Sequence, residues 1–362
     1  MRIALVGGIY GKDGEFRQKL QVTPEMVLEK GLCDRGHKIA TYGHYSTFNS
    51  KYFDVVHVHH LSYGAARMAV DEGNTAFTFT SHEGAAMTRR ASGLSRQLAA
   101  KFVVSRADAV IALSTTEADF QKRHYPLAGA FHQVIPNGVD TATYYYNRRN
   151  SAATNRRSRL LYVGQLSAQK NVEVLLRAVT HVKQPVDLQL VYHNSTLEDP
   201  LRALASTLRL KERVQFLGPK SPRELAVLYQ SADVFVLPSL AEALPSVVTE
   251  AMLCGTPVVA TDVGGVREQL GGYGVCVTPG HSTELASAIS HVLDNYDWFA
   301  AQSARASAYA SERFSIARMV DHHLELYANL LERKGPRRRH SAVGAPVDAL
   351  LRTGVNFICA TK

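Results

Sequence analysis

Long apolar runs are missing from this sequence. No uninterrupted hydrophobic stretch approaches the roughly 18 residues that a membrane-spanning helix requires. The apolar start at Arg2–Val6 gives way to glycine and charged residues too soon for a secretory signal peptide. Both absences argue against a membrane-spanning or secreted protein, so we expect a cytoplasmic one.

Cysteine is scarce as well, with four residues in a chain of 362. They are Cys33, Cys254, Cys276 and Cys359, and they show neither a CxxC spacing nor a histidine spaced for a zinc site. A disulfide framework is therefore not expected, and we predict reduced thiols.

Acidic residues are too few to balance the basic ones, which leaves a net charge of +9. Residues 1–150 hold 18 Lys and Arg against 13 Asp and Glu, residues 331–362 hold 7 against 2, and residues 151–330 hold 16 against 17. The basic first half and tail predict peripheral contact with an anionic membrane or an anionic acceptor, with simple solubility as the alternative. No aromatic stacking stripe or helix-turn-helix pattern accompanies the charge, so specific nucleic-acid binding is not expected.

What the sequence does contain is a strand, loop and helix pattern repeated in succession. The apolar run Val234–Leu237 has the short, β-branched character of a buried parallel strand. After a loop, Pro245 marks a helix start and Gly255 a helix end. A strand at 257–261 then leads through the glycine pair 264–265 into another helix. This alternation predicts an α/β protein with doubly wound parallel sheets, and the length is sufficient for two domains.

Two carboxylates lie within this pattern, Glu242 in the loop and Glu250 in the helix. A loop folded back over the helix N-terminus can bring both acids to one pocket. The free amides of that terminus form an anion site, with about half a positive charge from the helix dipole. The residues there are Leu244, Pro245 (which has no amide proton), Ser246 and Val247. A diphosphate at the amides and sugar hydroxyls at the acids would fit together; the alternative is two unrelated surface acids.

A specific order of residues runs across this segment: Pro238-Ser239, Glu242, Glu250-Ala251-Met252, Gly255-Thr256-Pro257-Val258-Val259, Gly264-Gly265 and Glu268. It resembles the donor-site signature of the retaining glycosyltransferases of family four. The resemblance implies the GT-B fold, two facing Rossmann-like domains with a nucleotide-sugar in the cleft. It also implies that Glu242 holds hydroxyls of the transferred sugar and Glu250 the ribose hydroxyls. Carboxylates suit both tasks because they accept from vicinal hydroxyl pairs.

The first half of the chain carries weaker motifs. A strand at Arg2–Val6 leads into a turn with Gly8 and Gly11, which permits close backbone approach to a phosphate or sugar but is neither GxGxxG nor a Walker loop. A strand at 75–80 ends just before His82, where the ligand crevice of an open α/β sheet lies. His82 resembles the family's cleft histidine, which contacts donor sugar or acceptor; a structural role at the strand end is the alternative.

The second half restarts with a strand at 160–163, followed by Gln165 and Lys170. In the family, an arginine and then a lysine at these places bind the donor diphosphate. Lys170 matches, and its ammonium suits phosphates whose charge grows as the leaving group departs. Gln165 departs from the family pattern because it supplies no charge. Leu217 ends a strand predicted at 213–217, which in the family borders the nucleotide base.

The predicted domain organisation follows from these motifs. Residues 1–146 form an N-terminal, acceptor-binding Rossmann-like domain, and the polar residues 147–159 form a linker. Residues 160–315 form the nucleotide-sugar-binding domain. The amphipathic stretch 316–332 is predicted to be the C-terminal helix that in GT-B folds crosses back to the first domain, and residues 333–362 form a basic tail.

No metal or other cofactor is expected. The sequence contains no Asp-x-Asp, the usual metal-diphosphate clamp of the other glycosyltransferase fold. Charge neutralisation is therefore left to Lys170 and the helix amides. His57, His59 and His60 suggest a metal, but adjacent strand residues face opposite sides and no acidic or cysteine partner is spaced to complete a site.

We therefore expect a retaining, metal-independent hexosyltransferase. The donor is a nucleoside-diphosphate sugar, with a UDP-sugar favoured over GDP-mannose, and the acceptor is a hydroxyl of a glycan, a lipid-linked molecule or a small molecule. No protein base is assigned, because in such enzymes the leaving phosphate is thought to take the acceptor proton. One alternative is a nucleotide-sugar-binding partner subunit with little turnover, which Gln165 suggests. Another is a different GT-B enzyme, such as a nucleotide-sugar epimerase or a phosphorylase, against which the pair Glu242 and Glu250 argues.

Overall fold

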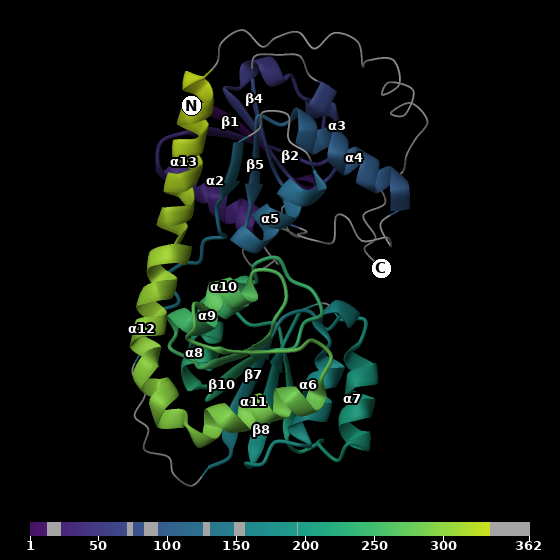
Figure 1. Ribbon diagram of the computed structural model, residues 1–362, viewed down its shortest axis with the longest axis vertical. Helices are drawn as coiled ribbons and strands as arrows, with labels where there is room; N and C mark the ends of the chain where they lie inside the picture. Colours follow the sequence, from purple (N-terminus) through teal and green to yellow (C-terminus); the bar gives the residue numbers. More distant parts are fainter. Residues whose placement is uncertain are drawn as a thin grey trace. The chain divides into compact units, whose positions relative to one another are not determined.

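The computed structural model describes residues 1–12, 23–70, 75–82, 93–125, 131–147, 156–193 and 195–333. The chain divides into two compact units. The first contains Met1–Ile135 and the chain from Met319 onward, and the second contains Pro136–Arg318. Each unit is a parallel sheet covered by helices (Figure 1). Residues 148–155 of the predicted linker and the tail 334–362 lie outside the described residues.

The sheet of the first unit has six strands within the described residues, in the order β2-β1-β3-β4-β5-β6. The strands are β1 (Arg2–Val6), β2 (Lys38–Tyr42), β3 (Val55–His59), β4 (Ala76–Thr80), β5 (Ala109–Ala112) and β6 (Phe131–Val134). The helices of this unit are α2 (Pro24–Asp34), α3 (Tyr63–Val70), α4 (Gly93–Arg106), α5 (Thr115–His124) and α13 (Ile316–Glu332). Val58, Phe79 and Val104 belong to one buried cluster between β3, β4 and α4. Burial on both faces explains why the central strands read as nearly continuous apolar runs.

The sheet of the second unit also has six strands within the described residues, in the order β12-β11-β10-β7-β8-β9. The strands are β7 (Ser158–Val163), β8 (Val186–Val191), β9 (Val214–Gly218), β10 (Val234–Leu237), β11 (Val258–Thr261) and β12 (Val275–Val277). The helices are α6 (Val172–Val179), α7 (Glu198–Thr207), α8 (Pro222–Ser231), α9 (Ser246–Leu253), α10 (Val266–Leu270), α11 (Ser282–Asp294) and α12 (Tyr296–Phe314). The expected doubly wound α/β architecture is confirmed.

Both sheets use an aspartate to fix the start of a central strand. Asp54, just before β3, accepts from the backbone N–H of Arg2 at 2.8 Å and from its guanidinium at 3.1 Å. Asp233, just before β10, accepts from the backbone N–H of Arg159 at 2.7 Å and from both terminal nitrogens of Arg156 at 2.7 and 2.8 Å. The aspartate thereby replaces a missing ladder acceptor and aligns neighbouring strands.

The division between the units falls at Ile135, ahead of the predicted linker 147–159. The residues in between join the second unit because Val139 forms a bridge with Ser315 and Tyr144 packs edge-on against Tyr229. The predicted C-terminal helix is α13, whose residues from Met319 onward belong to the first unit.

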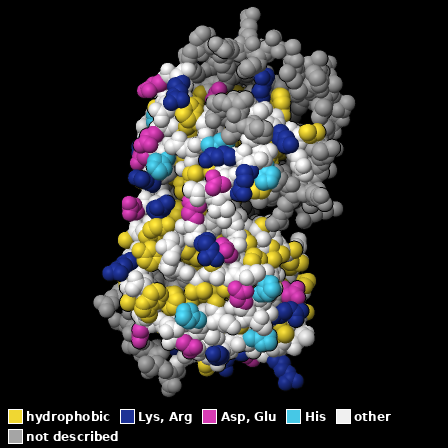
Figure 2. All heavy atoms as spheres, viewed as in Figure 1, with side chains coloured by type: hydrophobic (Ala, Val, Ile, Leu, Met, Phe, Trp, Pro, Cys, Tyr) yellow, Lys and Arg dark blue, Asp and Glu magenta, His cyan; other side chains and the backbone are white. Residues whose placement is uncertain are grey.

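No helix in the described ranges is both long and apolar enough to cross a membrane. On the face drawn in Figure 2, basic and acidic side chains are intermixed on each unit. The excess of basic residues in the first half therefore does not form a single-sign surface on that face.

Candidate functional site

The loop after β10 is held by backbone contacts on one side. The Leu240 amide donates to the Gln169 carbonyl at 2.8 Å, and the Gln169 side-chain amide donates to the Ala241 carbonyl at 2.8 Å. Gln169 belongs to the short 3-10 helix η5 (Ala168–Lys170), which follows β7. The two loops that carry the predicted donor residues are thus joined at the carboxyl end of the sheet, where ligands bind in such folds.

Lys170 and Glu242 form an ion pair at this junction. Lys170 Nζ lies 2.6 Å from Glu242 Oε1, and the two side chains are 20% and 8% exposed. The residues were predicted to bind the diphosphate and the transferred sugar. Because that sugar is bonded directly to the diphosphate, ligands for the two parts should lie next to each other, as these two residues do.

A glycine turn holds the same loop from the other side. Gly264 has a left-handed φ of +54°, and a Cβ there would lie 2.0 Å from the Glu242 carbonyl oxygen. The next amide, of Gly265, donates to the Ala243 carbonyl at 2.9 Å. Only glycine satisfies both the conformation and the close approach, which gives the first glycine of the pair, Gly264, a physical cause.

The start of α9 offers the predicted amides. Pro245 is the N-cap, and its carbonyl accepts from the Gln269 side chain at 2.9 Å, which anchors the helix start to α10. Leu244 and Pro245 are buried, whereas Ser246 and Val247 are partly exposed. First-turn amides lack a helical acceptor, so this end of the helix can bind an anion.

Glu250 lies further along α9, and its Oε2 accepts from the Tyr229 hydroxyl at 2.9 Å. Burial raises the pKa of Glu250 to about 7, although the tyrosine hydrogen bond opposes the rise. Glu250 thus contacts a tyrosine of α8, whereas Lys170 contacts Glu242. The three residues all belong to the second unit, but only Lys170 and Glu242 touch.

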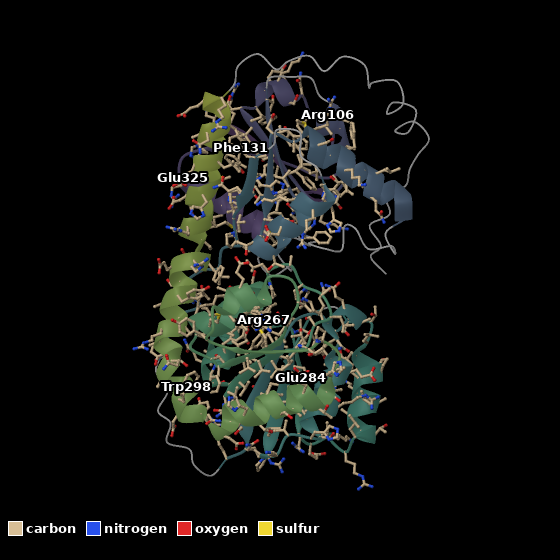
Figure 3. The ribbon with its side chains drawn as sticks, viewed as in Figure 1. Arg106, Phe131, Arg267, Glu284, Trp298 and Glu325 are labelled. Carbon is tan, nitrogen blue, oxygen red and sulfur yellow. The ribbon has the colours of Figure 1, made fainter. Side chains whose placement is uncertain are left out.

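The remaining predicted donor residues of the second unit have different surroundings. Gln165 is exposed, and its carbonyl accepts from the Tyr162 hydroxyl at 2.7 Å. Leu217 is partly buried near the end of β9. Their contacts with a nucleotide stay predictions. Figure 3 labels Arg267 on α10, whose guanidinium is engaged by Asp262 at 2.6 Å.

The predicted glycines of the first unit pack against their own chain. Gly8 and Gly11 bound a 3-10 helix, η1, after β1. A Cβ on Gly8 would lie 3.2 Å from the His44 ring, and a Cβ on Gly43 would lie 2.7 Å from Gly11 Cα. Close packing of two loops therefore explains small residues here, and an approach by donor phosphate stays a prediction.

His82 follows β4 in a left-handed conformation, with φ of +54°. Its Nε2 lies 2.9 Å from His59 Nδ1, and its ring is 4.9 Å from that of His60. Burial, followed by the charge of His60, lowers the pKa of His82 to about 3. At neutral pH the ring is therefore uncharged, so it can exchange hydrogen bonds with hydroxyls but brings no positive charge to a phosphate.

The sequence did not predict that His57, His59 and His60 lie close to His82. Adjacent strand residues do face opposite sides, but His57 and His59 are two apart and their rings stack at 4.2 Å. His60 has a φ of +67°, which breaks the strand, and its Nε2 lies 3.0 Å from the buried Glu25 carboxylate. The spacing of His57 and His59 was the available signal; nothing in the sequence pointed to Glu25. No group of three or more His, Cys, Asp and Glu within the described ranges is arranged to hold a metal.

Two family models match the chain. The model described as Glycosyl transferases group 1 matches residues 146–313, and that of Glycosyltransferase Family 4 matches residues 31–143. Among curated relatives, the D-inositol 3-phosphate glycosyltransferase of Rhodococcus opacus is 32% identical over 301 residues, covering 76% of this chain and 67% of the relative. That of Mycolicibacterium smegmatis is 31% identical over 332 residues, covering 86% and 74%.

Two solved structures with the same fold have lower sequence identity to this chain than these relatives have. Sucrose-phosphate synthase from Thermosynechococcus elongatus has a TM-score of 0.77 at 21% identity, covering 91% of this chain and 99% of that one. The Anabaena protein HepE in complex with UDP-glucose has a TM-score of 0.72 at 20% identity, covering 91% and 100%.

Proposed function

Because this chain belongs to the glycosyltransferases of family four and has their GT-B fold, we propose that it transfers a hexose from a nucleoside-diphosphate sugar to a hydroxyl group. Transfer retains the anomeric configuration. A UDP-sugar is favoured over GDP-mannose, and the UDP-glucose complex of the similarly folded HepE supports this choice. The acceptor is a hydroxyl of a glycan, a lipid-linked molecule or a small molecule.

The contact between Lys170 and Glu242 carries the proposal. Lys170 and the first amides of α9 neutralise the diphosphate as negative charge develops on it. Glu242 accepts from hydroxyls of the transferred sugar, and Glu250 accepts from the ribose hydroxyls. No metal takes part, and the leaving phosphate receives the acceptor proton. His82 contacts donor sugar or acceptor as a neutral ring.

One observation favours a second candidate, a partner subunit that binds nucleotide-sugar with little turnover. Gln165 is exposed and uncharged at the place where the family has an arginine. The positive charge that the protein places next to the diphosphate then comes from Lys170 and the helix amides alone. The leaving group is therefore stabilised less than in a site with two cations.

The test begins with melting-temperature shifts for a panel of UDP-, GDP- and ADP-sugars. A donor at 100 times its Kd adds about 2.7 kcal/mol to the free energy of unfolding, which is a shift of several degrees. Hydrolysis and transfer are then measured for the wild type, for Glu242→Gln and for a matched control, Glu212→Gln, whose side chain is exposed in the same unit. We expect kcat to fall about 100-fold in Glu242→Gln and to be unchanged in the control.

The two candidates give different results. Donor binding without hydrolysis or transfer, in wild type and Glu242→Gln alike, identifies the partner subunit. Absence of any melting shift across the panel refutes both.

The proposal includes peripheral contact with anionic membranes through the basic first half and tail. Co-sedimentation with vesicles containing anionic lipid tests this, and binding should weaken as salt rises. Equal binding to neutral vesicles would contradict it.

A further inference from the structure

A row of buried side chains runs from α13 to the centre of the first sheet. On α13, His323 and Tyr327 are buried, while the labelled Glu325 lies on the exposed side of the helix (Figure 3). The Tyr327 hydroxyl lies 2.7 Å from His57 Nδ1. His57 Nε2 lies 2.8 Å from Thr80 Oγ1, so both ring nitrogens of His57 are occupied.

The row continues through His59 to His82. The His59 ring stacks on His57 at 4.2 Å and is 2% exposed. Its Nδ1 lies 2.9 Å from His82 Nε2, and its Nε2 is buried without a hydrogen-bond partner in the described structure. Burial lowers the pKa of His57, His59 and His82, so all three rings are neutral near pH 7.

Each neutral ring carries one N–H, so the hydrogen bond between His59 and His82 can have either ring as its donor. If His82 Nε2 donates, His59 must carry its own proton on Nε2, where a buried N–H would have no acceptor. If His59 Nδ1 donates, the partnerless Nε2 is a bare lone pair. Orphaned buried N–H groups are rarer in proteins than unsatisfied acceptors, so the second arrangement is favoured. His82 then carries its proton on Nδ1.

We propose that His59 is a positioning residue: it donates from Nδ1 to His82 Nε2 and so fixes His82 as an Nδ1–H donor toward a sugar or acceptor oxygen. This inference rests on the proposed hexose transfer. The stack with His57, itself held by Tyr327 of α13, keeps the His59 ring in place. The bond also stabilises the left-handed backbone at His82, which a histidine adopts at a cost.

Two substitutions at one position test the hydrogen bond. His59→Asn keeps an amide near the place of Nδ1, whereas His59→Leu removes the donor. We expect kcat to fall about 30-fold in the leucine variant and less than about 5-fold in the asparagine variant, because one positioned donor is worth about 2 kcal/mol. The KM for the donor should change less than kcat in both. The proposal is overturned if the leucine variant keeps wild-type kcat, or if the two variants lose activity equally.

A direct measurement covers the case in which a variant does not fold. Nitrogen-15 spectra of the wild-type histidine rings distinguish protonated from bare nitrogens, with His82→Asn to assign the signal. We expect His82 to be protonated at Nδ1; protonation at Nε2 overturns the proposal. This result does not depend on turnover, so it separates a failure of this inference from a failure of the proposed function.

Tyr327→Phe, which removes only the hydroxyl on His57, should lower kcat two- to threefold.

Discussion

Each unit builds a six-stranded parallel sheet from its described residues, with a different strand order, and the two place different chemistry at the carboxyl end. In the second unit, an ammonium, a carboxylate and helix amides gather there, and backbone bonds and a glycine turn hold the loop that carries Glu242. In the first unit, buried imidazoles gather there beside the Glu25 carboxylate, and side-chain bonds that reach α13 hold the imidazoles. An edge with an ammonium suits a diphosphate, and an edge with imidazoles and a carboxylate suits hydroxyl groups. Under the proposed function, the parallel sheets set where the ligands bind, while the loops set which ligand binds.

The largest expected effect concerns the charged edge. Lys170→Met should lower kcat about 1000-fold, because the leaving diphosphate loses its side-chain cation. Lys211→Met, at an exposed lysine of the same unit, is the control and should keep wild-type kcat. Steady-state kinetics with a saturating donor measure the difference. If Lys170→Met turns over normally, charge at this edge has no catalytic role and the contrast with the first unit disappears.

The next effect compares the two strand-anchoring aspartates. Asp233 is 11% exposed and its partner Arg156 34%, whereas Asp54 and Arg2 are 32% and 56% exposed. Asp233→Ala should lower the free energy of unfolding by about 2 kcal/mol, because it leaves a partly exposed guanidinium and a strand amide without their acceptor. Asp54→Ala should cost about 1 kcal/mol or less. Denaturant titration measures both, and equal costs would show that burial does not distinguish the two anchors.

A smaller effect is the pH dependence of donor binding in the second unit. With a pKa of about 7, Glu250 is mostly protonated at pH 6 and mostly ionised at pH 8. Only the carboxylate can accept from two vicinal hydroxyls, so nucleotide Kd should be about tenfold lower at pH 8. Titration calorimetry tests this, and Glu250→Gln should bind weakly with no such dependence. A wild-type Kd that is flat from pH 6 to 8 would remove Glu250 from the ribose site.

The same raised pKa has a consequence for stability, with a definite sign. The folded state holds this proton more tightly than the unfolded state does, so the stabilisation is complete below the ordinary carboxyl pKa and is lost as pH rises through about 7. Glu250→Gln should therefore melt higher than wild type at pH 8 and not at pH 4.

The smallest effect is an expected absence of change in the first unit. Burial lowers the pKa of His82 to about 3 and that of His323 to about 4. Their ring signals should stay constant between pH 6 and 8, while exposed histidines in the same spectrum titrate. Titration of His82 in this range would add a positive charge to the edge of the first unit, and the two edges would then differ less than proposed.

Local patterns made the second unit predictable. Strands β10 and β11 are short, mostly apolar runs bounded by Pro or Asp, and the signature from Pro238 to Glu268 lies in one segment of chain. The pairing of Lys170 with Glu242 joins residues 72 apart in sequence, and only the family resemblance brought them to one site in advance. The first unit was harder. Its defining contacts join His59 to His82, 23 residues apart, and His57 to Tyr327, 270 apart, and no short pattern encodes them.

The capping residues of α5 show why even a local sequence rule can predict the wrong hydrogen-bond partner. Ser114 and Glu117 fit a capping box, and Ser114 does cap the helix by accepting from the Glu117 amide at 3.1 Å. The Glu117 carboxylate instead accepts from the Leu113 amide at 2.8 Å and the Ser81 hydroxyl at 2.7 Å. The Glu117 carboxylate thus binds the buried hydroxyl of Ser81, the residue before His82. The capping-box rule considers only residues of the helix start, so it could not predict this contact.

The last described helix, α13, is an integral part of the first unit, and this sets the order in which the protein is completed. The six described strands of the first unit and four of its helices precede the second unit along the chain, yet His57 in β3 gains its Tyr327 partner only 270 residues later. The second unit, whose residues end at Arg318, is complete before that. The sheet of the first unit therefore begins before that of the second but is finished after it, and a chain that stops at Arg318 would carry a complete second unit and a first unit with an open core.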